Sequence, residues 1–190
     1  MLLQITEFLL ETLVAFFVYL LLARFYFQWR RVSFRNQLGE FLIRTTNWIV
    51  LPARRVVPAL GGLDLASWSA AWLLQALGLF LVFSLRGWDY GSAPGSALAV
   101  LLGLALIDLV RFSIYILVFA LIMQAVLSWV NPHTPFGPVF DALTRPFLRP
   151  LRRFIPPVAN IDLTPLLLLV VLQVLLIPAA HLRGLLGGML

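Results

Sequence analysis

The sequence predicts an all-α integral membrane protein with about four transmembrane helices, arranged as two tandem repeats of helix, interfacial amphipathic segment and helix. Hydrophobic residues make up 62% of the 190 residues and charged residues only 12%, whereas a soluble domain is nearer half apolar and a quarter charged. Several apolar runs are long enough to cross a bilayer. The motif P-x-R-R-x-x-P occurs twice, at 52–58 and 150–156.

The doubled motif defines the two repeats. Its copies lie 98 residues apart, and each is followed by an Asp-Leu pair, Asp64-Leu65 and Asp162-Leu163. A nearly neutral stretch rich in turn formers, 87–95, separates the halves. We therefore expect a first repeat over residues 1–92 and a second over 93–190.

In the first repeat, the apolar runs predict spans at about 8–29 and 65–85. The first of these would be about 33 Å long as a helix, enough to cross the hydrocarbon core. Between them, apolar residues at helical spacing predict an amphipathic segment at about 38–58 that lies in the interface. We expect Pro52 and Pro58 to break this helix.

In the second repeat, residues 96–130 form an apolar run that is too long for one simple crossing. We expect a span at about 110–130 and, before it, an extra apolar helix at about 96–109. One long, tilted helix is the alternative.

The rest of the second repeat follows the pattern of the first. The apolar side chains of the segment at about 138–157 fall on one side of a helix, and its four arginines fall on the other. We expect Pro146 and Pro150 to kink or divide it. The last span is expected at about 164–183, with Thr164 as its N-cap.

The distribution of charge predicts the orientation. Ten of the 14 basic residues lie in the two segments that follow the first and third spans. The positive-inside rule places these segments in the cytoplasm and both termini outside. Because the arginines stand between hydrophobic runs, we expect no direct nucleic-acid partner. The two halves would have the same topology, as in a parallel repeat.

Composition also limits the chemistry. The chain has no cysteine and two histidines, which excludes disulfides and thiol chemistry and argues against a zinc site. No Ser-His-Asp spacing, phosphate loop or pair of acid/base carboxylates rises above chance. We expect no enzymatic activity, no cofactor and no metal.

The candidate lipid- or partner-binding residues are the arginines of the two amphipathic segments. Their guanidinium groups can clamp lipid phosphates or an acidic segment of a partner. The alternative is that they only determine topology. The candidates are Arg54, Arg55, Arg149, Arg152 and Arg153.

Two pairs of polar residues are equivalent between the repeats. Asp64 and Asp162 are expected to be helix N-caps; a salt bridge to the arginine motif and an ion or proton site are the alternatives. Gln75 and Gln173 lie inside spans, where an amide needs a partner. They would meet across the bundle and hold helices together, or line a transport pathway.

Four further polar residues are predicted within spans, where such residues are functional candidates by default. They are Glu11, Arg24, Asp108 and Arg111. Asp108 and Arg111 stand at i, i+3 spacing and are expected to pair on one helix face.

These motifs resemble the YggT family, also called YlmG, of small bacterial and plastid membrane proteins. The first half matches through Arg24, Trp29, its arginine motif and Gly61-Gly-Leu-Asp64-Leu65. The second half matches through Ser128-Trp129, Asn131-Pro132, Thr144-Arg-Pro146, its arginine motif and Asp162-Leu-Thr-Pro165. The first half lacks an Asn-Pro pair after Trp29, and Gln124 stands where the family arginine would align.

The resemblance implies a multi-pass protein of the bacterial inner membrane. It implies roles in osmotic-stress tolerance, cell division or nucleoid distribution, or cytochrome b6 assembly in plastids, none of which is a defined biochemical activity.

Two functional hypotheses follow from the sequence. The first is a membrane scaffold or assembly factor that presents two arginine-rich segments to anionic lipid headgroups or to a membrane-protein partner. The second is a small channel or ion-transport accessory that works as a homo-oligomer, with Gln75, Gln173 and Asp108 as lining candidates.

Overall fold

The computed structural model describes residues 1–58, 62–88, 94–131, 134–154 and 162–189. Its elements, in order, are α1 (Leu2–Trp29), α2 (Gln37–Val56), α3 (Leu65–Leu85), α4 (Pro94–Val130), α5 (Gly137–Phe154) and α6 (Thr164–Gly187). Four of them, α1, α3, α4 and α6, are long and apolar enough to cross a membrane. The prediction of an all-α, multi-pass membrane protein is confirmed.

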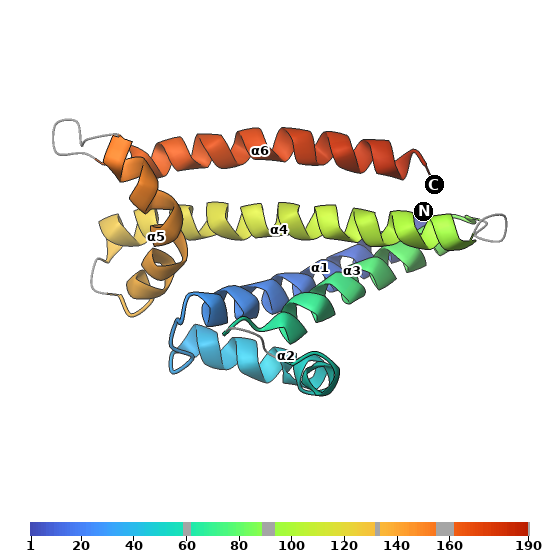
Figure 1. The fold of residues 1–190 in the computed structure, drawn as a ribbon, viewed down its shortest axis with the longest axis horizontal. Helices are drawn as coiled ribbons and strands as arrows, with labels where there is room; N and C mark the ends of the chain where they lie inside the picture. The colour runs from blue at the N-terminus through green and yellow to red at the C-terminus, as the bar shows by residue number, and fades with distance from the viewer. Residues whose placement is uncertain (59–61, 89–93, 132–133, 155–161, 190) are drawn as a thin grey trace.

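The same order of elements occurs twice: a long helix, an amphipathic helix and a second long helix. Helices α1 and α3 pack together, as do α4 and α6, and α3 packs against α4 to join the two halves (Figure 1). Both termini lie at one end of the bundle, which we call the terminal end. The α1–α2 and α4–α5 connections lie at the other, which we call the arginine-rich end (Figure 1).

The expected division of 96–130 into two helices is wrong. Helix α4 is continuous over 37 residues, about 55 Å at 1.5 Å per residue. After Pro94 this stretch contains no proline, and the side chain of its buried Asp108 is hydrogen-bonded, so nothing interrupts the backbone. Because about 20 residues suffice to cross the core, α4 must tilt or extend beyond it.

The prolines inside the amphipathic helices do not break them, whereas α2 ends just before Pro58, as predicted. Helix α2 continues through Pro52, and α5 is one helix through Pro146 and Pro150, because each proline removes only one backbone hydrogen bond. Helix α2 ends where Val57 adopts φ −115° and ψ 99°, since the residue before a proline avoids helical geometry. The predicted positions 155–157 lie outside the described residues.

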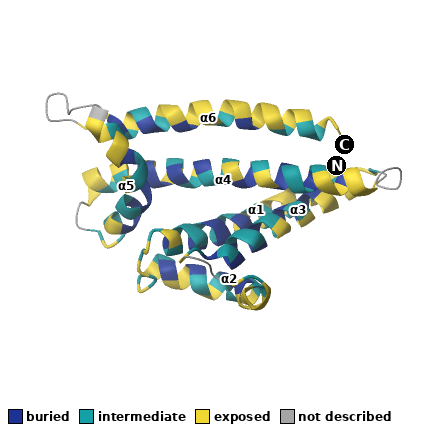
Figure 2. Cartoon of the chain, viewed as in Figure 1, coloured by how far each residue is buried: buried dark blue, intermediate teal, exposed yellow. Residues whose placement is uncertain are grey.

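Apart from α4, the largest differences from the predicted bounds are in α1 and α6. Helix α1 begins six residues before the predicted position and α6 ends four residues after it, whereas α3 has the predicted bounds. At both extended ends the chain keeps helix-compatible residues, and only Gly187 and Gly188 close α6. Many apolar residues of both helices are exposed, and exposed positions recur along α6 (Figure 2), as expected of helices that face lipid.

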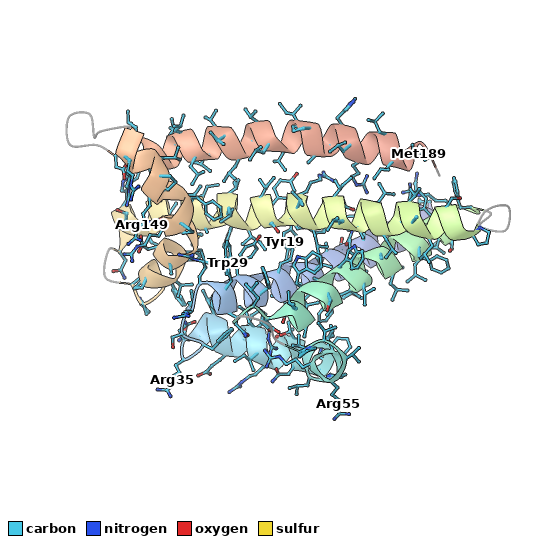
Figure 3. All side chains as sticks on the ribbon, in the orientation of Figure 1. Tyr19, Trp29, Arg35, Arg55, Arg149 and Met189 are labelled. Atoms are coloured by element: carbon cyan, nitrogen blue, oxygen red, sulfur yellow. The ribbon has the colours of Figure 1, made fainter. Side chains whose placement is uncertain are left out.

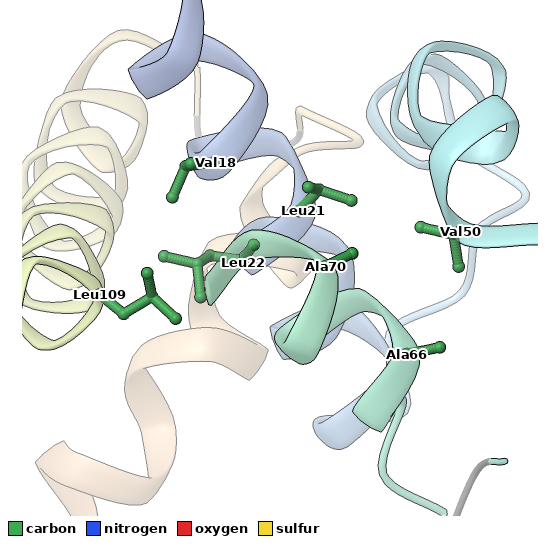
Figure 4. Close-up of a cluster of buried hydrophobic side chains, with 8 residues drawn as sticks. Val18, Leu21, Leu22, Val50, Ala66, Ala70 and Leu109 are labelled. Atoms are coloured by element: carbon green, nitrogen blue, oxygen red, sulfur yellow. The ribbon is translucent and has the colours of Figure 1, made fainter. Parts of the chain in front are cut away.

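One buried cluster joins the first repeat to α4. It consists of Val18, Leu21, Leu22, Val50, Ala66, Ala70, Ala71 and Leu109 (Figure 4). Small residues on α3 let α1 approach closely. At Gly78, a Cβ atom would lie 2.8 Å from Cγ1 of Val14. The two helices therefore have no room for a larger side chain at this crossing.

Candidate functional site

Five polar side chains meet near the arginine-rich end of the first repeat. We call this group, Arg24, Thr46, Asn47, Arg54 and Asp64, the Arg24 cluster. The Arg24 side chain is buried; Nη1 donates hydrogen bonds to Oγ1 of Thr46 at 2.8 Å and to Oδ1 of Asn47 at 2.9 Å. Its Nε lies 3.7 Å from Oδ2 of Asp64. The same carboxylate oxygen accepts a 2.9 Å hydrogen bond from Nη2 of Arg54. The cluster ties α1 and α2 to the start of α3.

Asp64 is the centre of this cluster and is fully buried. Burial alone would raise the pKa of its carboxyl group, but hydrogen bonds from Arg54 and Ser67 outweigh burial, and the pKa lies below its ordinary value. The carboxylate is therefore ionised opposite two guanidinium groups. Asp64 occupies the N-cap position of α3, as predicted, but its side chain makes no capping bond to the backbone of that helix. The alternative, a salt bridge to the arginine motif, is confirmed.

The second repeat keeps this pairing but places it at the surface. Nε of Arg152 donates to Oδ2 of Asp162 at 2.9 Å, and the two side chains are 46% and 40% exposed. The place of Arg24 is taken by Gln124, whose Oε1 accepts a 2.7 Å hydrogen bond from Oγ1 of Thr144. Thr144 corresponds to Thr46. The second repeat thus lacks the buried guanidinium.

Asp162 also holds the start of α6. Oδ1 accepts a hydrogen bond from the backbone N–H of Thr164 at 3.0 Å. The prediction of Thr164 as the N-cap is wrong, because Thr164 is the first helical residue and Leu163 is the N-cap. Burial alone would raise the pKa of the Asp162 carboxyl group. Hydrogen bonds from Thr164 and Arg152 outweigh this effect, so the pKa lies below its ordinary value.

The two arginines of each motif have different environments. The first, Arg54 or Arg152, pairs with the aspartate of its own repeat. The second, Arg55 or Arg153, is exposed, as is Arg149. Figure 3 shows Arg55 directed away from the bundle. Among the described side chains, none forms an ion pair with these three. They are free to meet a ligand at the arginine-rich end.

A second polar group lies toward the terminal end. We call Gln75, Asp108, Arg111 and Arg183 the Asp108 cluster. The buried Asp108 carboxylate accepts hydrogen bonds from Nε2 of Gln75 at 3.0 Å, Nη1 of Arg111 at 3.1 Å and Nε of Arg183 at 2.8 Å. The predicted Asp108–Arg111 pair is confirmed. The cluster connects α3, α4 and α6, and so joins the two repeats.

Sequence reasoning missed Arg183 in this cluster. Its partner is 75 positions away, and no local spacing connects them. The available signal was a lone arginine at the end of an apolar run, which reads equally well as a topology determinant.

The expected meeting of the two repeat-equivalent glutamines is wrong. Gln75 is buried against Asp108, whereas Gln173 is exposed on α6. The reason is that α3 packs against α1 on one side and α4 on the other, whereas among the described elements α6 packs mainly against α4 and α5.

Glu11 lies on α1, where its carboxylate is 3.9 Å from Nη2 of Arg86. Arg86 makes its shorter ion pair, 3.1 Å, with Glu7, and that hydrogen-bonded pair raises the pKa of Arg86. Glu11 also lines a cavity of about 340 Å³ beside the Asp108 cluster. Among the described residues, no group of three His, Asp or Glu side chains is placed to hold a metal.

Comparison with known proteins connects this arrangement to one family. The CCB3/YggT family model matches residues 3–85 and 103–182, which correspond to the two repeats. The protein named for the proC 3′ region of Vibrio alginolyticus is 34% identical over 168 residues, 88% of this chain and 89% of its own length. YggT of Escherichia coli K12 is 30% identical over 184 residues, 96% of this chain and 93% of its own.

A further relative, PA0392 of Pseudomonas aeruginosa, is 31% identical over 170 residues, 88% of this chain and 84% of its own. None of the three names states an activity or a ligand. No solved structure matches the chain. With both halves matched by the family model and relatives aligned over most of their length, the chain belongs to the CCB3/YggT family.

Proposed function

We propose that the protein is a membrane scaffold or assembly factor that presents α2 and α5 to anionic lipid headgroups or to an acidic segment of a membrane-protein partner. One observation carries the proposal. Both amphipathic helices bury an apolar face against the spans, through Leu42 and Val50 in α2 and Phe140 and Leu148 in α5. The opposite faces leave arginines exposed.

The different environments of the two arginines in each motif support this proposal. Pairing of Arg54 and Arg152 with the aspartates holds the motif against the span, and leaves Arg55 and Arg153 unpaired among the described side chains. An arginine near an anionic membrane surface contributes about 1 kcal/mol of binding free energy. Its planar fork suits bidentate contact with phosphate or carboxylate. Topology alone does not require such a fixed frame.

We also propose a membrane and an orientation for the protein. Ten of the 14 arginines lie in or beside α2 and α5, and the connections to these helices lie at the end of the bundle opposite the termini (Figure 1). The positive-inside rule therefore favours a cytoplasmic arginine-rich end and external termini. The bacterial relatives favour the inner membrane. The proposed role involves no reaction, cofactor or nucleic acid.

The test is photo-cross-linking in the membrane from position 149, with mass spectrometry of the products. We compare the unaltered chain with a variant carrying Arg55→Glu and Arg153→Glu. The proposal expects one dominant acidic partner or anionic lipid, and loss of that product in the variant while insertion is retained. A matched control exchanges the exposed pair Glu40 and Arg44, which keeps net charge. Unchanged products in the variant would refute the proposal.

A second candidate function, an oligomeric channel or ion-transport accessory in the osmotic-stress response, is favoured by the 340 Å³ cavity lined by Glu11, Gln75, Asp108, Arg111 and Arg183. Charged groups beside a cavity in a span are typical of ion pathways. Purified protein in liposomes should then raise ion flux under osmotic or voltage gradients, and Asp108→Asn should abolish the increase. Absence of flux in all conditions counts against this function.

A further inference from the structure

Gln173 is a polar side chain exposed on a membrane-spanning helix. Among the described residues no group hydrogen-bonds its amide, and its neighbours on the same face of α6 are exposed as well: Val170 by 52%, Val174 by 56% and Ile177 by 68%. An amide that faces hydrocarbon is costly, and such residues are typical of helix–helix contacts. We call Val170, Gln173, Val174 and Ile177 the α6 stripe.

The first repeat shows what this stripe does when it is covered. At the offset of 98 residues, the stripe corresponds to Trp72, Gln75, Ala76 and Leu79 of α3. All four engage α4. Nε1 of Trp72 donates to the carbonyl of Leu102 at 3.0 Å, and Gln75 donates to Asp108. Leu79 and Ala76 pack in a cluster with Leu101, Leu104 and Ala105.

Helix α4, which covers this face of α3, has a repeat-equivalent in the same chain, helix α1. Helix α4 corresponds to α1 at an offset of 100 residues, which aligns Trp129 with Trp29 and Gln124 with Arg24. Gln124 is hydrogen-bonded to Thr144, and Arg24 is hydrogen-bonded to the equivalent Thr46. Ala105 and Asp108 then correspond to Ile5 and Phe8, which are 47% and 66% exposed. One turn further on, Glu11 offers an exposed carboxylate.

Topology agrees with this correspondence. Helix α3 meets α4 antiparallel, because consecutive spans cross in opposite directions. A second copy inserted in the same orientation presents its α1 antiparallel to α6. The depths are similar too: Gln75 and Gln173 lie about 15 and 14 Å from the first residue of their helices. Asp108 lies about 32 Å from Trp129, and Glu11 lies about 27 Å from Trp29.

We propose that the α6 stripe binds a second copy of this chain through the Ile5–Phe8–Glu11 face of that copy's α1, in the way that α3 binds α4 within one chain. Gln173 donates a hydrogen bond to a carboxylate of the second copy, with Glu11 as the acceptor in the place of Asp108. Because the two faces differ, the contact is heterologous and links successive copies in the plane of the membrane. The inference is independent of the proposed function, since it uses none of the arginines at the arginine-rich end.

Cross-linking tests the contact directly, because the chain has no cysteine. Chains with Ile5→Cys under one affinity tag are mixed with chains with Ile177→Cys under another, in liposomes of phosphatidylethanolamine and phosphatidylglycerol, and are oxidised. We expect a disulfide-linked product that carries both tags. The matched control is Leu175→Cys, which is 49% exposed but lies about 160° away from Ile177 around α6.

Three results would overturn the proposal: no cross-linked product, equal yield from Leu175→Cys, or a product formed by Ile177→Cys chains alone, which would mean that two α6 helices face each other. A second measurement needs no cysteine. Energy transfer between labelled chains in the same liposomes should show association that Gln173→Leu weakens about threefold to tenfold. This substitution faces lipid in the single chain and leaves its fold intact. Unchanged association in Gln173→Leu would remove the role of the amide.

Discussion

The two repeats share a motif but use it differently. In the first, Asp64 is fully buried between Arg24 and Arg54, whereas in the second Asp162 is 40% exposed and, among the described residues, forms an ion pair only with Arg152. The difference follows one position, where Arg24 is replaced by Gln124. A buried carboxylate requires strong compensation, and two guanidinium groups supply it. With a neutral amide instead, the aspartate remains where water reaches it. The buried ion pair thus occurs in the repeat that supplies a second guanidinium group, and the exposed ion pair occurs in the repeat that does not.

The largest expected effect comes from removing the buried carboxylate. Asp64→Asn leaves the Arg24 guanidinium buried without its counter-charge, which costs about 3–5 kcal/mol of unfolding free energy. Asp162→Asn, the matched change in the second repeat, removes an exposed pair and costs about 0–1 kcal/mol. Unfolding of the purified protein in detergent measures both. Equal losses would show that the burial difference has no energetic meaning.

A smaller effect is expected at the crossing of α1 and α3. In Gly78→Leu the new side chain collides with Val14, and overpacking of this kind costs about 1–3 kcal/mol. Gly184→Leu is the control, because nothing lies within 4 Å of a Cβ atom there. The same unfolding measurement applies. If Val14→Ala fails to reduce the loss from Gly78→Leu, the collision is not its cause.

The pairing of Arg24 with Asp64 can be separated from burial by a double-mutant cycle. Arg24→Gln gives the first repeat the residue of the second, and Gln can bond Thr46 as Gln124 bonds Thr144. Combined with Asp64→Asn, the double variant should be about 0.5–3 kcal/mol more stable than the two single losses predict. Additive losses would mean that Arg54 alone compensates Asp64.

The smallest effect is on acid stability. The pKa of Asp64 is lower in the folded protein than its ordinary value of 3.8, so the folded form binds fewer protons than the unfolded form in that range. Its contribution is fully present above about pH 3.8 and is lost as the pH falls through the lower folded-state value. Unfolding measured between pH 2 and 5 should show a steeper decline for the unaltered chain than for Asp64→Asn. Parallel curves would contradict the assignment.

Most of the architecture could be predicted from the sequence. The bounds of α3 follow from the length of one apolar run, and the motif at fixed spacing placed α2 and α5 because amphipathicity and proline position are local properties. Helix α4 is longer than one crossing requires, so its length alone predicts two helices. Its buried Asp108 is bonded by side chains of α3 and α6, and these contacts lie outside any local window of sequence.

The site was predictable only in part for the same reason. The Arg54–Asp64 and Arg152–Asp162 pairs lie ten residues apart, close enough for the motif to suggest them. The participation of Thr46, Asn47 and Arg183 depends on how helices far apart in sequence are packed. Sequence equivalence also failed for Gln75 and Gln173, because α3 and α6 occupy equivalent places in their repeats but pack against different sets of helices.

The Arg24–Asp64 pair also sets an order of events during synthesis. The two residues are 40 positions apart, so α1 reaches the membrane with an unpaired arginine before its counter-charge has been made. At about 5–20 residues per second the interval is a few seconds, and an arginine in a span costs about 2.5–3.5 kcal/mol on insertion scales when central. During this interval α1 depends on the translocation machinery or on the surface for its charge. Arrival of Asp64 at the start of α3 supplies the counter-charge, so we expect α1 to reach its full stability in the bilayer only after α3 has been made.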